Sequence, residues 1–76
     1  MLASQLGLTI KNRRKELRIT QPHLAELAGV SINTVYKLER GQGNPTFEAL
    51  NKLAEVLGME LTLSVKRNIS ATKSYL

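Results

Sequence analysis

The sequence predicts a small all-α domain of four to five helices with a C-terminal β-strand. Apolar residues recur with helical spacing in four segments, and three of these segments begin at a serine or threonine that can cap a helix. After residue 58 the pattern changes to alternation of apolar and polar residues, which favours a strand. A chain of 76 residues is long enough for one hydrophobic core, and because it has no cysteine, no disulfide can stabilise that core.

The first two predicted helices occupy the N-terminal third of the chain. The first covers residues 5–17, and most of its surface is basic or polar. The second begins after Thr20, a good N-cap, tolerates Pro22 in its first turn and ends at Gly29. The predicted inward residues are Leu6, Ile10 and Leu17 in the first helix, and Leu24, Ala25, Leu27 and Ala28 in the second.

The third and fourth predicted helices follow the same scheme. Ser31 caps the third helix, and Gly41 ends it. Pro45 then changes the chain direction, Thr46 caps the fourth helix, and Gly58 ends it. The predicted inward residues are Ile32, Val35 and Leu38 in the third helix, and Phe47, Leu50, Leu53, Ala54 and Leu57 in the fourth.

The C-terminal segment is predicted to form a strand that pairs across a homodimer. Its apolar residues alternate: Met59, Leu61, Leu63 and Val65. A fifth helix is the alternative, because Met59 and Leu63 also lie four residues apart. One strand with an apolar edge has no partner in its own chain, whereas a second copy can pair with it. We therefore expect a helical domain over residues 1–58, a dimerising strand over 59–66 and a flexible tail over 67–76.

The composition limits the classes of function that we expect for this protein. Eleven Lys and Arg residues against six acidic residues give a formal charge of +5, which suits a phosphate-bearing partner without proving one. An enzyme is not expected, because the chain is small, lacks Cys and Asp, and has only His23 as a neutral-pH base. The same inventory predicts no metal site and no cofactor. No membrane span or signal peptide is recognisable, so we expect a cytoplasmic protein.

The connection between the second and third helices indicates a DNA-binding protein. Gly29, Val30 and Ser31 form a three-residue turn of the kind that joins the helices of a helix-turn-helix, whose second helix enters the major groove. Along the third helix, 100° per residue places Val35 and Leu38 opposite one polar face. That face carries Asn33, Tyr36, Lys37 and Arg40, with Thr34 to one side.

These side chains suit two kinds of DNA contact, although a merely solvated helix face is the alternative. Asn33 can pair with adenine, Lys37 can donate to guanine, and the Thr34 methyl can meet thymine. Tyr36 joins the base-reading set without an assigned base. The residues expected at phosphates are Gln21 at the start of the second helix, the cationic Arg18 and Arg40, and Asn44 in the following turn.

Glu39 has a different role, because helical geometry places it beside the apolar side of the third helix. An unpaired carboxylate there would be costly, so a cationic partner is expected. Both Arg13 and Arg14 lie near the apolar stripe of the first helix, and either can form the ion pair.

The stretch RRKELRITQPHLAELAGVSINTVYKLERGQGNPTFEALNKLAEVLG resembles the Cro/repressor-type, or XRE, helix-turn-helix family. The resemblance runs over residues 6–58. It implies that Gln21 contacts phosphate, that Asn33, Thr34 and Lys37 face bases, and that Arg14 rather than Arg13 pairs with Glu39. Ile32 departs from the polar base-reading residue that many members have there, so no polar contact is expected from it.

The ending MELTLSVK, together with RRKEL, is similar to the HipB-like antitoxins, small repressors paired with a HipA-like kinase toxin. This resemblance implies a strand-paired homodimer that represses its own toxin operon. Such a dimer would read a palindromic operator with half-sites about 34 Å apart, or a multiple of that distance. The alternatives are a stand-alone transcriptional regulator without a toxin and a protein-interaction module.

Overall fold

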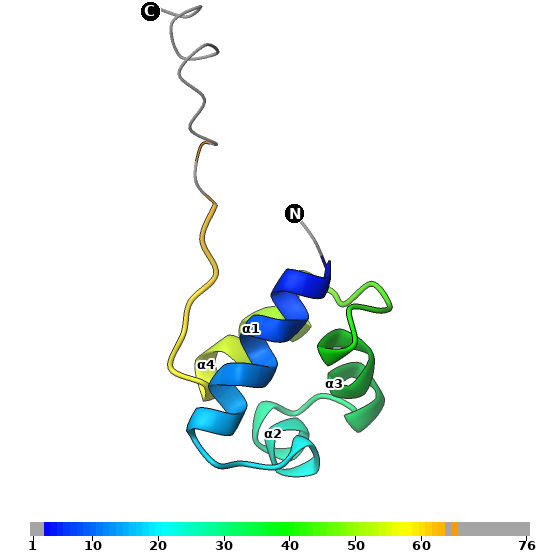
Figure 1. Cartoon of the computed structure of the whole chain (residues 1–76), viewed down its shortest axis with the longest axis vertical. Helices are drawn as coiled ribbons and strands as arrows, with labels where there is room; N and C mark the ends of the chain where they lie inside the picture. The colour runs from blue at the N-terminus through cyan, green and yellow to red at the C-terminus, as the bar shows by residue number, and fades with distance from the viewer. Residues whose placement is uncertain (1–2, 64, 66–76) are drawn as a thin grey trace, which may run out of the picture.

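The computed structural model describes residues 3–63 and 65, and this part of the chain contains four helices (Figure 1). They are α1 (Ala3–Glu16), α2 (Gln21–Ala28), α3 (Ile32–Glu39) and α4 (Phe47–Val56). α1 packs against α3, and α2 contacts both α3 and α4. The predicted all-α fold is confirmed. None of the helices in the described ranges is long and apolar enough to cross a bilayer.

Three helices begin at the predicted capping residues. Each cap has extended backbone geometry, and its hydroxyl accepts a hydrogen bond from the amide three residues later. These bonds satisfy amides that have no partner within the helix. The bonds run from the amides of His23, Thr34 and Ala49 to Thr20, Ser31 and Thr46, over 3.2, 3.1 and 3.0 Å.

Each of the four helices is followed, within two residues of its end, by a residue with positive φ, and one of these residues is not glycine. Gly29, Gly41 and Gly58 follow α2, α3 and α4, with φ between 69° and 74°. Arg18 follows α1, with φ of 59°. The Arg18 amide donates to Lys15 O, and the Ile19 amide donates to Arg14 O. A side chain in this conformation costs about 1–2 kcal/mol, a cost that the glycines avoid.

The core lies where the four helices meet. Its largest fully buried side chains are Leu24, Val35, Leu38, Leu53 and Leu57, and α1 adds Ile10. Gly7 of α1 is buried against α3, where a Cβ would overlap the carbonyl oxygen of Leu38. Glycine therefore allows the two helix backbones to approach closely.

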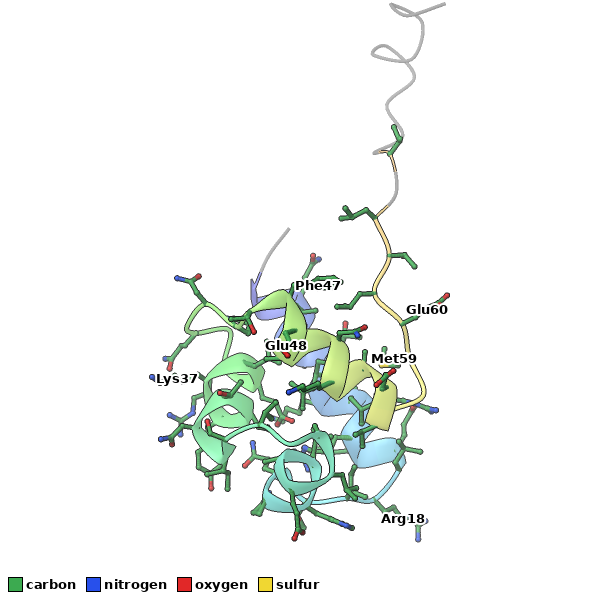
Figure 2. All side chains as sticks on the ribbon, turned by 180° about the vertical axis from the view of Figure 1, so that it is seen from behind. Arg18, Lys37, Phe47, Glu48, Met59 and Glu60 are labelled. Carbon is green, nitrogen blue, oxygen red and sulfur yellow. The ribbon has the colours of Figure 1, made fainter. Side chains whose placement is uncertain are left out.

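Three predicted inward residues are instead exposed. Leu17 is 41% exposed because α1 ends at Glu16 and leaves it in the turn. Leu27 is 54% exposed, because the buried stripe of α2 passes through Leu24, Ala25 and Ala28. Phe47 is 71% exposed because it begins α4 at the end of the helix beyond the core (Figure 2).

Beyond α4 the described chain is neither helical nor paired with another segment. Residues 59–63 leave the end of α4 without helical structure, so the alternative of a fifth helix is not observed there. Met59 packs partly against the core, whereas Leu63 and Val65 are exposed. A strand that pairs with a second copy is not tested by a single chain, so it stays a prediction. Residues 64 and 66, and the predicted tail over 67–76, lie outside the described residues.

Candidate nucleic-acid interface

The outer side of α3 presents a polar surface on a helix that is firmly fixed from its inner side. Val35 and Leu38 are fully buried. The predicted contact residues are all exposed, in agreement with their angular positions on the helix: Asn33, Tyr36, Lys37 and Arg40. In this α2–turn–α3 arrangement, the second helix of the pair is free to enter a groove.

Thr34 lies at the edge of this surface and also supports the helix. Its hydroxyl lies 2.9 Å from the Ser31 hydroxyl, which also accepts the Thr34 amide as the N-cap of α3. Thr34 is half-buried, so less of it is available than of Asn33. Its methyl remains the group predicted to meet thymine.

A shallow hollow of about 210 Å³ links α3 to the turn that follows it. It is lined by Thr34, Lys37, Gln42, Gly43, Asn44 and Pro45. The hollow therefore brings two predicted base-reading residues, Thr34 and Lys37, beside Asn44, which was predicted to bind phosphate. The amide and ammonium groups around it can donate to phosphate oxygens or to base acceptors.

Beneath this surface, Arg14, Glu39 and Gln21 form a buried polar network, which we call the α3 clamp. Arg14 Nε and Nη2 donate to the two carboxylate oxygens of Glu39 over 2.8 and 3.0 Å. The two side chains are only 10% and 2% exposed. Arg14 Nη1 also donates to Ile19 O over 2.8 Å. The bidentate pair ties α1 to the end of α3, and the bond to Ile19 O ties α1 to the α1–α2 turn.

Arg13, the other candidate partner for Glu39, points elsewhere. Its Nε donates to Leu57 O over 2.9 Å, and its Nη1 contacts Glu16 over 3.2 Å. It therefore holds the end of α4 rather than α3. The two neighbouring arginines thus connect α1 to different helices.

Gln21 has a role in the clamp that the sequence did not indicate. Its Nε2 donates to Glu39 Oε1 over 2.9 Å, so this side chain is directed inward. One Nε2 hydrogen of Gln21 is left for the predicted phosphate contact. The His23 and Leu24 amides at the start of α2 already donate to Thr20, and Pro22 has no N–H. Gln21 therefore links the predicted phosphate-binding end of α2 to the carboxylate at the end of α3.

Arg18 and Lys37 lie on different parts of the surface. Arg18 projects from the α1–α2 turn, and Lys37 projects from α3 on the opposite side of the view (Figure 2). Arg40 is the C-cap residue of α3, one turn beyond Tyr36 and Lys37. The structure thus groups Lys37 with Asn44 and Thr34, whereas Arg18 stands apart from that group.

Sequence reasoning missed Gly7, Gly43 and the clamp role of Gln21. Gly7 had a signal, because a glycine inside a helix lowers helix propensity and suggests a packing reason. Gly43 lines the hollow next to the Lys37 side chain, and its φ is 75°. Leu38 is not adjacent to Gly7 in the sequence, nor is Lys37 adjacent to Gly43, so only the fold identifies these two contacts.

The four-helix arrangement, with a capped and buried α3 whose outer side is polar, defines a helix-turn-helix DNA-binding domain. Comparison with known proteins agrees, because the helix-turn-helix family matches residues 10–63. The chain belongs to this XRE-type family of DNA-binding transcription regulators, a class that is typically not enzymatic.

Relatives of this chain include regulators of different lengths. An HTH-type transcriptional regulator of Methanothermobacter thermautotrophicus is 41% identical over 51 residues, which cover 67% of this chain and 74% of the relative. A longer HTH-type regulatory protein of the same organism is 37% identical, and the match covers 78% of this chain but 19% of the relative. The transcriptional repressor RstR of the cryptic phage CTXphi of Vibrio cholerae is 36% identical, over 68% of this chain and 46% of RstR.

Two solved structures have the same fold. The clp gene regulator ClgR of Corynebacterium glutamicum is 30% identical with a TM-score of 0.73, over 79% of this chain and 64% of ClgR. The restriction-modification controller protein C.AhdI of Aeromonas hydrophila is 31% identical, also with a TM-score of 0.73, over 76% of this chain and 88% of C.AhdI.

Proposed function

We propose that this chain is a sequence-specific transcriptional repressor that binds a palindromic operator as a homodimer. The observation that carries this proposal is the outer side of α3, where Asn33, Tyr36 and Lys37 are exposed on a helix fixed by the buried clamp. Asn33 and Lys37 would contact base edges, and Gln21, Arg40 and Asn44 would contact phosphates. Occlusion of the promoter would then repress transcription.

Selection from a random duplex library tests sequence-specific binding. Enriched duplexes are expected to share one inverted repeat, because two α3 helices related by a two-fold axis read the same bases in each half-site. Enrichment without a common sequence would contradict operator recognition. Matched affinities at two salt concentrations then separate base contacts from phosphate contacts.

The homodimer proposal is supported by the exposed apolar residues after α4. Leu63 and Val65 are exposed, and they alternate with polar positions. Strand pairing with a second copy would cover one apolar side of the segment and satisfy its backbone groups.

A pair of charge substitutions tests this arrangement. Leu63→Lys is expected to give a monomer by sedimentation velocity, because it places a charge on the paired apolar side. Thr62→Lys is the matched control, because it adds the same charge at the alternate position, and it should leave the dimer intact. A Leu63→Lys dimer of unchanged stability would place the interface on the helices instead.

The finer proposal is that the repressor is a HipB-like antitoxin that autoregulates a toxin operon. Its support is the resemblance of MELTLSVK and RRKEL to that group. The stand-alone regulator is the second candidate, favoured by relatives named as regulators and by the phage repressor RstR. Affinity capture from the native host distinguishes them. A kinase-sized partner with operator DNA supports the antitoxin, DNA alone supports the stand-alone regulator, and protein alone supports an interaction module.

A further inference from the structure

The side chain of Lys37 runs beside the α3–α4 turn before it reaches solvent. A Cβ placed on Gly43 would lie 3.4 Å from Lys37 Cβ and 3.5 Å from Lys37 Cδ. These distances are ordinary van der Waals contact, so a Cβ at position 43 would touch the Lys37 methylene groups without overlapping them, and only atoms beyond Cβ could displace them. Position 43 therefore lies directly beside the methylene groups of Lys37.

The turn that carries Gly43 is fixed to the same residue by its backbone. The Gln42 amide donates to Lys37 O over 2.7 Å, and the Gly41 amide donates to Leu38 O over 2.9 Å. Gly43 itself has φ of 75°, and Pro45 restricts the chain just beyond it. The turn and the end of α3 therefore form one hydrogen-bonded unit around Lys37.

We infer that Gly43 is a positioning residue for Lys37 and thereby a determinant of operator specificity. The absence of a side chain at position 43 leaves the Lys37 methylene groups their place along the hollow. A longer side chain at position 43 would occupy that place and turn Lys37 aside. The inference rests on the proposed base-reading role of Lys37, and it adds the α3–α4 turn to the parts of the fold that set specificity.

Gly43→Asn is the sharpest test, because asparagine tolerates positive φ while its side chain extends beyond Cβ. Gly58→Asn is the matched control. Gly58 has φ of 69°, and a Cβ there would meet only Arg13 Nη2, at the ordinary contact distance of 3.5 Å. Its neighbour Met59 lies across the molecule from Lys37 (Figure 2). Both variants are measured with the selected operator duplex and with a shuffled duplex of equal length and composition.

The quantity compared is the operator preference, which is the ratio of the dissociation constants for the shuffled and the operator duplex. A purely structural role of Gly43 would not alter this ratio. Gly43→Asn should lower the operator preference about tenfold, the size of one well-formed base contact, and Gly58→Asn should leave it within about twofold. In a Lys37→Ala background, Gly43→Asn should produce no further loss of preference. Gly43→Ala adds only the contacting Cβ and should give a smaller loss. Gly43→His, whose longer side chain is also found at positive φ, replaces Gly43→Asn if that variant does not fold.

Several outcomes would overturn the inference, and they are distinguishable from failure of the proposed function. An unchanged preference in both Gly43 variants, with preference still dependent on Lys37, would refute only the positioning role. An equal loss in the Lys37→Ala background would assign the effect to direct contact between position 43 and DNA. If the unsubstituted protein binds operator and shuffled duplexes equally, sequence-specific repression itself is wrong.

Discussion

On its inner side, α3 contacts α1 and α2 through Val35, Leu38 and the carboxylate of Glu39. On its outer side it presents Asn33 and Lys37 to solvent. The inner groups are buried and paired, so changing them disturbs many contacts at once. The outer groups have few partners in the chain, so their chemistry is available to a ligand. Loss of stability and loss of DNA binding should therefore be separable by side.

The largest effect is expected at the inner side, from Glu39→Ala. The substitution leaves the buried guanidinium of Arg14 without its carboxylate and should lower the free energy of unfolding by about 3–5 kcal/mol. Urea denaturation followed by circular dichroism measures this change. Glu48→Ala is the control, because its pair with Lys52 is exposed and spans 3.8 Å, and it should cost about 0.5 kcal/mol or less. Similar losses in both variants would mean that the clamp contributes no more than a surface pair.

Gly7→Ala should have the next largest effect, because the new Cβ would overlap Leu38 O and force α1 away from α3. A net loss of about 1–3 kcal/mol is expected, although alanine favours helix by itself. Asn12→Ala, at an exposed position of the same helix, supplies the control and should be neutral or slightly stabilising. A stabilised Gly7→Ala variant would contradict the close approach of the two backbones.

At the outer side, Lys37→Ala should leave the unfolding midpoint unchanged and weaken operator binding by about 1–3 kcal/mol. Fluorescence anisotropy with operator and shuffled duplexes measures the difference between the two affinities. Equal weakening on both duplexes would remove Lys37 from the base-reading set and assign it to phosphate.

The smallest effect is expected for Arg18→Gly, and its two consequences should have opposite signs. Glycine at φ of 59° relieves strain and should raise stability by up to about 1 kcal/mol. Loss of one phosphate contact should reduce the slope of log affinity against log salt by about 0.9. Thermal denaturation and salt titration provide the two measurements. An unchanged slope would show that the Arg18 charge is merely solvated.

The sequence predicted local features of the fold, such as helix caps, better than it predicted which apolar side chains are buried. Thr20, Ser31 and Thr46 act where they were expected, because capping depends on a few neighbouring residues. Leu27 and Phe47 were wrongly placed inside, because hydrophobicity alone does not say which edge of a short helix the other helices cover.

The candidate site shows the same division between local and long-range features. The exposed side of α3 followed from helical angle alone, since Val35 and Leu38 fixed the inner direction. The contacts of Gln21 with Glu39 and of Gly43 with Lys37 did not, because each needs the relative placement of separate elements. Helical angle alone allowed either Arg13 or Arg14 to pair with Glu39, and only the family resemblance favoured Arg14. In the structure Arg14 forms this ion pair, whereas Arg13 donates to Leu57 O.

The hydroxyl pair of Ser31 and Thr34 bears on how the specificity of this protein can evolve. Asn33 and Lys37 are exposed, so they can mutate with little cost to folding. If they read bases as proposed, copies of the gene can diverge toward new operators through these positions. Thr34 is less free, because its hydroxyl lies 2.9 Å from the capping hydroxyl that starts α3. Divergence at the first turn of α3 is therefore expected to retain small hydroxyl residues at position 34 while its neighbours vary.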